Sequence, residues 1–435
     1  MKIIERHVAV LVPGFRCHLR PRIMHWVTSM VRCCAVLTAL VMLAACETLP
    51  PQKPAPAPTP APVTPQPPAE VLPAKPLESV SHLRASNWDA VPGWRDDNPQ
   101  LAWNAFLTGC GTLKHQPAWR SICTVALALE QPARDTLLRF FEVNFTPYQV
   151  VNPDGSDNGL TTGYYEPLLH GSRTRSARYR YPVYGVPDDI VVIDLGKLYP
   201  ELKYMRLRGR LEGRRVVPYF DRAQIEAGAA PLAGREILWV EDPVELFFLH
   251  IQGSGRVRLE SGETIMLGYA EQNGHPYRSI GRLLIDRGEL TLEQASMQGI
   301  KAWARRNPAR LQDLLNNNPS YVFLHELPAG LSSPPGTLGV PLTAGRSIAV
   351  DPRYIPLGAP VFLATTMPNS NQPLRRLMLA QDTGGAIRGA VRADFFWGFG
   401  NEAGILAGAM RQRAKMWVLL PNDYLPPDGN PPRNP

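Results

Sequence analysis

The chain has 435 residues, of which 44% are hydrophobic and 6 are Cys, so it can bury a sizeable core and form about two domains. This composition excludes collagen, coiled coils and disulfide-dense mini-proteins. The formal net charge is +8, but residues 1–45 carry six basic residues and one acid, which leaves 40 basic and 37 acidic residues for the remainder. A nearly neutral remainder lacks the basic surface that nucleic acids require, so we expect no nucleic-acid partner.

Residues 1–45 have the features of a signal peptide. Arg32 precedes an apolar run of thirteen residues, Cys33 to Ala45, which is too short to span a bilayer but matches the apolar core of an export signal. The run ends in Leu43-Ala44-Ala45-Cys46, which resembles the lipobox of bacterial lipoproteins, where the Cys is acylated and begins the mature chain. We therefore expect Cys46 to be a lipid anchor, with an ordinary secretory signal as the alternative.

The segment after Cys46 indicates where the protein is held. In lipoprotein sorting an Asp after the acylated Cys favours the inner membrane, so Glu47 favours the periplasmic face of the outer membrane. Twelve prolines lie among the 27 residues from Pro50 to Pro76, a composition that favours an extended polyproline II tether. At about 3.1 Å per residue it spans roughly 80 Å. Residues 46–76 are thus expected to be a lipidated tether, and residues 426–435 a disordered tail.

Two cysteines remain in the folded part once the signal and the anchor are set aside. In an oxidising periplasm Cys110 and Cys123 can bond, and closing so short a loop stabilises the fold by about 3 kcal/mol. Two free buried thiols on neighbouring helices are the alternative.

The periodicity of apolar residues predicts helices at both ends of a β-rich segment. Apolar spacings of three and four predict helices at 101–107, 119–129 and 133–145. Short β-rich runs follow from 148 to about 267, including 181–186, 190–193 and 236–240. Further helices are predicted at 279–286, at 291–305 with Thr291 and Gln294 at capping-box spacing, and after Asn307-Pro308. Strands at 347–351, 361–364 and 374–382, with glycines at the corners, suit a small closed barrel.

Three acids stand beside these last strands. Any one of Asp351, Asp382 and Asp394 alone has the position of a turn former whose oxygens accept backbone N–H bonds. However, Thr383-Gly384-Gly385 offers Asp382 backbone donors that would keep it ionised, whereas the aromatics after Asp394 would raise its pKa. A carboxyl that stays protonated near neutral pH is the general acid that glycosidic-bond cleavage needs. Metal motifs such as HExxH are absent from the sequence, and we expect neither a metal nor a cofactor.

Several segments carry a resemblance to a known family. In chain order they are Thr162-Gly-Tyr-Tyr-Glu-Pro167, His250-Ile-Gln-Gly-Ser-Gly255, Tyr269 with Asn273-Gly-His-Pro-Tyr-Arg-Ser-Ile-Gly281, Asp351-Pro-Arg-Tyr-Ile-Pro-Leu-Gly358, Ala380-Gln-Asp-Thr-Gly-Gly-Ala-Ile-Arg-Gly389 and Arg392-Ala-Asp-Phe-Phe-Trp-Gly398. From about Trp103 to Leu420 the chain resembles the membrane-bound lytic murein transglycosylase A family. Its C-terminal part is similar to the three-Asp (3D) domain, whose acids fall on Asp351, Asp382 and Asp394.

The resemblance implies a mostly β fold with peripheral helices. A double-psi β-barrel would be assembled from residues 77–167 and 326–425, on either side of a smaller inserted β-rich domain at 168–325. A groove between the two domains would hold the glycan.

The resemblance also implies a reaction. Enzymes of this family cleave the β-1,4 bond between N-acetylmuramic acid and N-acetylglucosamine without water, because the muramyl 6-hydroxyl attacks its own anomeric carbon and leaves a 1,6-anhydro ring. Asp394 would donate a proton to the leaving oxygen and then accept one from the 6-hydroxyl. Asp382 would stay charged and orient Asp394 or stabilise the oxocarbenium character, and Asp351 would support a barrel turn.

The same motifs imply the residues that bind the glycan. Tyrosine faces, amides and hydroxyls suit a neutral sugar chain, and the candidates are Thr162, Gly163, Tyr164, Tyr165, Gln252, Gly253, Ser254, Tyr269 and Asn273. Core packing is the alternative role for the three tyrosines. The expected partners are peptidoglycan glycan strands, the membrane through the lipid anchor, and cell-wall enzyme complexes. Two other functions stay open: an inverting muramidase with Asp394 as acid and Asp382 as base, and a non-catalytic peptidoglycan-binding lipoprotein.

Overall fold

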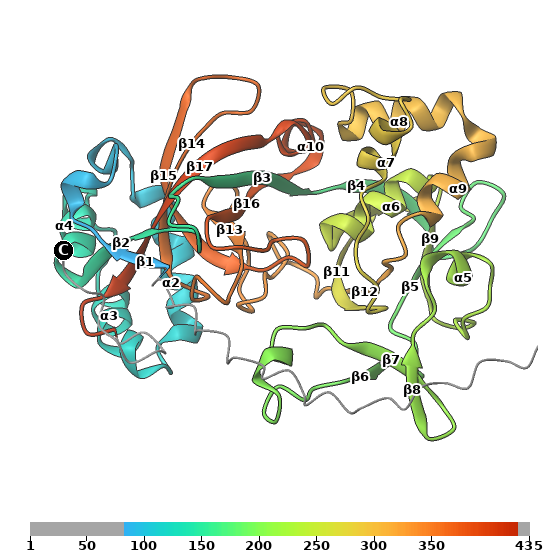
Figure 1. Cartoon of the computed structure of the whole chain (residues 1–435), viewed down its shortest axis with the longest axis horizontal. Coiled ribbons are helices and arrows are strands. Elements are labelled where there is room, and N and C mark those ends of the chain that lie inside the picture. The colour runs from blue at the N-terminus through green and yellow to red at the C-terminus, as the bar shows by residue number, and fades with distance from the viewer. Residues whose placement is uncertain (1–81, 425–435) are drawn as a thin grey trace, which may run out of the picture. The chain divides into compact units, whose positions relative to one another are not determined.

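The computed structural model describes residues 82–424 (Figure 1). The predicted signal peptide (1–45), the anchor Cys46, the tether (46–76) and the tail (426–435) lie outside these residues. No helix within 82–424 combines the length and the apolar character needed to cross a membrane.

The larger sheet is built from both ends of the described chain. Its order is β1-β2-β17-β14-β15-β13-β16-β3, and β17 also pairs with β3. The strands are β1 (Leu83–Ala85), β2 (Phe145–Val150), β3 (Gly159–Glu166), β13 (Ser347–Val350), β14 (Pro360–Thr366), β15 (Pro373–Asp382), β16 (Arg392–Phe399) and β17 (Arg411–Pro421). Strands before residue 167 therefore share one sheet with strands after residue 346.

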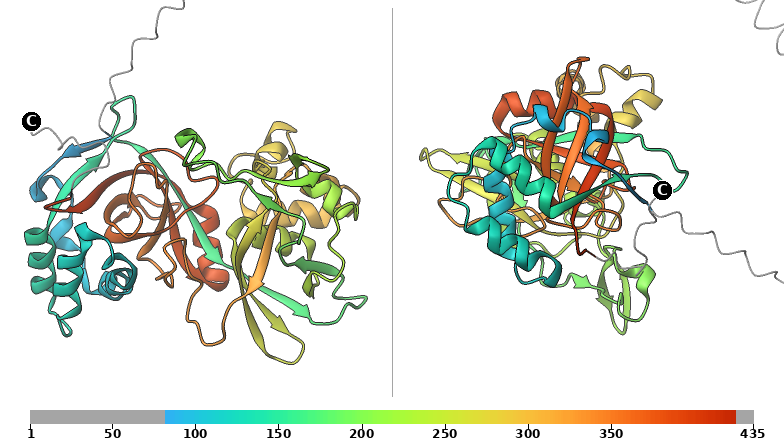
Figure 2. Two further views of the ribbon diagram at one scale, coloured as in Figure 1. Left: turned by 90° about the horizontal axis from the view of Figure 1, so that it is seen from below. Right: turned by 90° about the vertical axis from the view of Figure 1, so that its left-hand side faces the viewer.

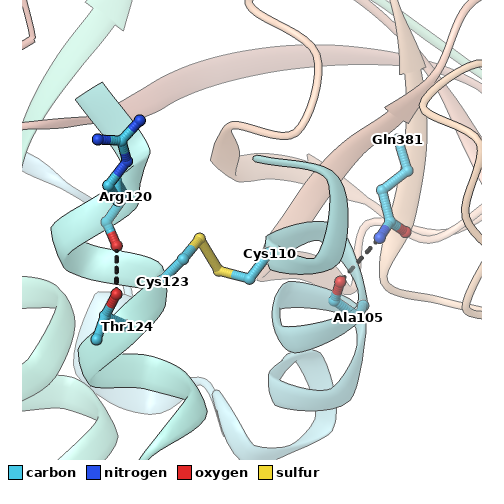
Figure 3. Close-up of a disulfide and its surroundings, with 6 residues drawn as sticks. All are labelled: Ala105, Cys110, Arg120, Cys123, Thr124 and Gln381. Atoms are coloured by element: carbon cyan, nitrogen blue, oxygen red, sulfur yellow. Dashed lines mark hydrogen bonds between the residues drawn. A yellow bond between two sulfur atoms is a disulfide. The ribbon is translucent and has the colours of Figure 1, made fainter. Parts of the chain in front are cut away.

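Three helices, at positions close to those that the apolar spacing predicts, pack against strands β15, β17 and β2 of this sheet. They are α2 (Gln100–Leu113), α3 (Pro117–Leu127) and α4 (Arg134–Asn144), and Figure 2 shows them gathered together. Two short 3₁₀ helices, Trp88–Ala90 and Trp94–Asp96, precede them. Phe106 and Phe141 are fully buried in the shared core. A disulfide joins Cys110 on α2 to Cys123 on α3, with the two Cα atoms 5.3 Å apart (Figure 3).

The inserted segment forms two smaller sheets. A six-stranded sheet has the order β12-β11-β10-β4-β9-β5, and a three-stranded sheet the order β6-β7-β8. Their strands are β4 (Leu168–Ser172), β5 (Tyr181–Tyr184), β6 (Val191–Val192), β7 (Arg208–Glu212), β8 (Arg215–Pro218), β9 (Glu236–Val240), β10 (Ser254–Leu259), β11 (Thr264–Gln272) and β12 (Val322–Glu326). The chain leaves the larger sheet between β3 and β4 and returns to it after β12.

Helices in and beside the insert differ in part from the sequence expectation. They are α5 (Arg222–Glu226), α6 (Pro243–Gln252), α7 (Ile280–Asp286), α8 (Met297–Arg306), α9 (Leu311–Asn316) and, after β16, α10 (Gly400–Ala409), with 3₁₀ helices at Pro200–Leu202 and Pro308–Arg310. The β-rich prediction for 148–267 missed α6. Its signals were local: Asp242 caps the first turn, Pro243 stands at the first helical position, and Gly253 ends the helix at φ 79°.

The helix predicted at 291–305 starts later than expected. Thr291 and Gln294 do exchange the two capping-box hydrogen bonds, at 3.0 and 3.3 Å. The turn that they close is not continued, because Ser296 caps a new start and α8 begins at Met297.

Candidate active site

The two predicted catalytic acids belong to one row of four residues, each on a different one of four neighbouring strands. Asp382 on β15 is in register with Ala349 on β13, Ala349 with Asp394 on β16, and Asp394 with Thr162 on β3. Residues in register on adjacent strands project to the same face of a sheet. Two strand spacings separate the acids, or roughly 10 Å between their Cα atoms.

Asp394 is held by a hydroxyl and a guanidinium. The Thr162 hydroxyl donates a hydrogen bond to Asp394 Oδ1, and Arg392 Nη2 donates to Thr162 Oγ1 over 2.8 Å. Within the described chain, Asp394 Oδ2 has no protein hydrogen-bond partner. Burial, with a smaller contribution from the charge of Asp382, raises the pKa of Asp394 to about 6 against the opposing effects of Thr162 and Arg392. Asp394 can therefore carry a proton near neutral pH.

Asp382 is held by several donors. Its Oδ1 accepts from the backbone N–H and the hydroxyl of Thr337, both at 2.9 Å, and from the Thr383 N–H at 2.8 Å, while the Tyr164 hydroxyl donates to Oδ2 over 3.1 Å. Of the run Thr383-Gly384-Gly385, which the sequence offers as backbone donors, Thr383 donates to Asp382, and Thr337 in a distant loop supplies two further donors. Burial raises the pKa of Asp382, and the hydrogen bonds oppose this rise.

Tyr164 connects the acid pair to the neighbouring cavity. Burial raises the pKa of its phenol well above the usual range, and the charges of Asp382 and Asp394 add to the rise. The phenol therefore stays protonated and acts as a donor to Asp382. Its ring packs against Phe396, with centroids 5.1 Å apart.

A cavity of about 600 Å³ lies beside the acids, between residues of the larger sheet and residues of the insert. Six of the predicted site residues line it: Tyr164, Gln252, Gly253, Ser254, Tyr269 and Asp382. Asp394 and Thr162 are not part of its wall, but they lie on the strands β16 and β3 next to it. The Tyr269 side chain is 38% exposed, so its ring is accessible to a ligand.

Three predicted glycan-binding residues have other roles in the structure. Asn273 is completely buried, and its amide joins three segments through bonds to the Phe220 and Pro319 carbonyls and from the Tyr321 N–H, so no group of it is left for a sugar. Tyr165 is 5% exposed and donates to Met297 Sδ, which makes it a core aromatic. A Cβ on Gly163 would lie 2.7 Å from the Trp397 indole nitrogen, so this glycine allows the indole to pack closely.

Asp351 lies away from the acid pair and is completely buried. Its carboxylate accepts from the Arg353 guanidinium at 2.6 Å and from the Gly389 N–H at 2.9 Å. Its backbone carbonyl also accepts from the N–H groups of Tyr354 and Ile355, which closes the turn after β13. Although burial alone would raise it, the pKa of Asp351 is lowered by these hydrogen bonds.

Some residues of the site carried no recognisable sequence signal. Thr337 lies in a Pro-rich loop outside the quoted motifs, and Arg206 lies between two short strands of the insert. Arg222 is almost fully buried and donates to His250 Nδ1 at 3.3 Å, while His250 Nε2 has no partner among the described residues. Burial, and then the charge of Arg222, lower the pKa of His250 far below its usual range, so it is neutral. No group of three or more His, Cys, Asp and Glu side chains in residues 82–424 is placed to hold a metal ion.

Comparisons with known proteins show what the chain is similar to. The sequence-family model of the MltA specific insert domain matches residues 160–325, and the family model of the 3D domain matches residues 346–420. The membrane-bound lytic murein transglycosylase A of Escherichia coli K12 is 34% identical over 280 residues, covering 62% of this chain and 68% of that protein.

Solved structures extend the similarity to the fold. The crystal structure of MltA from Neisseria gonorrhoeae is 43% identical, with a TM-score of 0.68 over 79% of this chain and 93% of that chain. The structure of E. coli MltA with bound chitohexaose is 28% identical, with a TM-score of 0.57 over 73% of this chain and 90% of that one. The chain therefore belongs to the membrane-bound lytic murein transglycosylase A family.

Proposed function

We propose that the protein is a lytic transglycosylase that cleaves the β-1,4 bond between N-acetylmuramic acid and N-acetylglucosamine in peptidoglycan without water and leaves 1,6-anhydro ends. Family membership supports the peptidoglycan lytic activity. Chitohexaose in a related structure supports the binding of a sugar chain in this family's fold. The cavity beside the acids, walled by tyrosine, amide and hydroxyl groups, suits such a neutral chain.

Asp394 is the proposed general acid and base. The observation that carries this role is a partly buried carboxyl with a pKa of about 6, with one oxygen bonded to Thr162 and the other without a hydrogen-bond partner in residues 82–424. The protonated carboxyl can donate to the leaving oxygen, and the resulting carboxylate can then accept the proton of the muramyl 6-hydroxyl. One acid therefore serves both steps.

Asp382 is proposed to act through its charge. It is tied to Thr337, Thr383 and Tyr164, so it cannot easily move toward the substrate as a nucleophile would. The Asp382 carboxylate, on the strand β15 that pairs with β13, can stabilise positive charge that develops on the sugar ring. Asp351, which closes a turn, is proposed as structural support.

The proposed reaction is tested by mass spectrometry of the products released from intact sacculi. Anhydro ends are lighter by one water than the reducing ends that a hydrolase leaves. Reducing ends would favour the inverting muramidase, in which Asp382 activates a water across a wide gap between the carboxyls. Binding without release of soluble muropeptides would favour the non-catalytic lipoprotein.

Location and architecture are part of the proposal. Lipidation at Cys46 would hold the enzyme at the periplasmic face of the outer membrane, where complexes with other cell-wall enzymes would form. Names of relatives support association with a membrane. For the larger sheet we propose the double-psi β-barrel, which is supported by the pairing of β17 with β14, β2 and β3.

A further inference from the structure

Two arginines meet at Gly385, an exposed residue of the cavity wall. Arg206 also lines the cavity, and its Nη1 lies 3.8 Å from the point where a Cβ on Gly385 would be. Arg388 belongs to the same turn as Gly385, and its Nε donates to the Gly385 carbonyl over 3.2 Å. One cation from the insert and one from the 3D domain therefore approach the same residue.

The protein does not neutralise this pair with a carboxylate. Other arginines of the cavity wall have acidic neighbours: Arg208 contacts Glu271 at 2.8 Å, and Arg222 lies 3.9 Å from Glu226. Within residues 82–424, no carboxylate oxygen lies within 4.0 Å of the guanidinium of Arg206 or Arg388.

Burial and the neighbouring arginines disfavour the positive charge of Arg388. Burial lowers the pKa of Arg388, and the charges of Arg353 and Arg206 lower it further, while Asp351 opposes them. Asp351 already accepts from Arg353 and from the Gly389 N–H. An external anion between Arg206 and Arg388 would relieve their repulsion.

Arg206 is also held in place by an aromatic ring. Its guanidinium carbon lies 5.7 Å from the centroid of Tyr269, which lines the same cavity. Stacking on a ring occupies the face of the guanidinium plane and leaves its N–H edge available for a planar acceptor.

We propose that Arg206 and Arg388 bind a carboxylate of the peptide stem that peptidoglycan carries on its muramic acid residues. This inference rests on the proposed function and adds a charge preference to it. The hydroxyl and acetamido groups of the glycan are neutral, whereas the stem bears carboxylates that match the guanidinium fork. Gly385 follows Asp382 by three residues, so a stem bound there would belong to a sugar close to the catalytic acids.

The test compares two substrates that contain the same glycosidic bonds. One is a glycan strand with its peptide stems, and the other is the same strand after an amidase has removed them. Arg206→Gln and Arg388→Gln are each expected to lower kcat/KM about tenfold on the stem-bearing strand, through a higher KM, because a charge-assisted hydrogen bond is lost. On the stem-free strand Arg388→Gln, whose side chain is exposed and does not line the cavity, should stay within about twofold of the wild type.

Arg215 of the insert provides a matched control. It lies on β8, its side chain is exposed and makes no hydrogen bond or ion pair with residues 82–424, so Arg215→Gln should change the rate on neither substrate. A third substrate, in which the stem carboxyls are amidated, shows whether the enzyme recognises the charge of the stem or only its size. The wild type should cleave it with the same kcat/KM as the stem-free strand.

Equal losses on both strands, or no loss on the stem-bearing strand, would overturn the carboxylate site. So would a wild-type enzyme that cuts amidated and native stems equally well. If Arg206→Gln does not fold, the exposed Arg388→Gln decides the question alone. Reducing ends from the wild type would instead contradict the proposed function, and this result does not depend on the arginines.

Discussion

The Thr162 hydroxyl donates its hydrogen bond to Asp394 Oδ1 across the neighbouring strands β3 and β16. Its direction is imposed by Arg392, whose Nη2 donates to Thr162 Oγ1 at 2.8 Å, so the single hydroxyl proton is directed at the carboxyl. This bond leaves Oδ2 without a hydrogen-bond partner among residues 82–424. Thr162, which is also predicted to bind glycan, therefore hydrogen-bonds the proposed acid.

Replacing Asp394 should abolish the activity without unfolding the protein. Asp394→Asn preserves the shape of the side chain but removes the proton donor, and general acid–base catalysis contributes about 10²–10⁴-fold, or roughly 3–5 kcal/mol of barrier. Asp382→Asn should keep a measurable residual activity, because it removes only charge. Rates of muropeptide release measure both effects, with Asp89→Asn at an exposed position as the control. Equal losses in the two variants would favour an acid and base pair acting on water.

Removing the charge of Arg392 should move the pH profile upward. The reaction needs protonated Asp394, so kcat/KM falls as the pH rises through a pKa of about 6. The charge of Arg392 lowers that pKa, so Arg392→Gln should raise it and shift the alkaline limb upward by about 1 pH unit. Arg411→Gln, at an exposed residue in register with Thr162 on the other side of β3, is the control. An unchanged limb in Arg392→Gln would show that Asp394 is not the group that titrates.

The raised pKa of Asp394 should also make the free energy of unfolding depend on pH. An unfolded Asp has a pKa of about 3.9, so the folded state binds more protons between about pH 4 and 6 and loses stability as the pH rises through this window. Asp394→Asn avoids this loss. Its free energy of unfolding should exceed that of the wild type by about 1–3 kcal/mol at pH 7.5, and by far less at pH 4. Urea titrations at the two pH values measure it, and an identical difference at both would contradict the shift.

The bond between Cys110 and Cys123 should be present in the purified protein. When the domain that contains these two cysteines is denatured without a reductant, thiol titration should find no free thiol. After reduction the same titration should find two free thiols. Replacing both cysteines by Ser should lower the free energy of unfolding by about 3 kcal/mol. The effect should reach the site, because α2 accepts a 2.8 Å hydrogen bond at the Ala105 carbonyl from Gln381, the neighbour of Asp382 (Figure 3). Two titratable thiols without reduction would contradict the disulfide.

The lipid anchor is tested by a single substitution. Cys46→Ala should yield a periplasmic protein that stays in the soluble fraction, because the acylated residue is lost. Fractionation after a salt wash measures it. Finding Cys46→Ala still in the membrane fraction would refute the anchor.

Local patterns in the sequence determined the helices around the larger sheet and the identity of the acids. Apolar spacing predicted α2, α3 and α4 because a helix buries one stripe of its own surface, whatever lies opposite. The aromatics after Asp394 likewise indicated desolvation of its carboxyl, because two of them, Phe395 and Phe396, are buried beside it.

Only the tertiary structure decided which of the motif residues meet. Asp382, Ala349 and Asp394 share a row because β13 lies between β15 and β16, an order that differs from the order along the chain. The pairing of β13 with β15 also contains a register shift just before Ala349. Strand order is set by long-range pairing, which local spacing does not encode. The burial of Asn273, a glycan-binding candidate from the family motifs, was also decided by the tertiary structure, because its amide donates to carbonyls that are distant in the sequence.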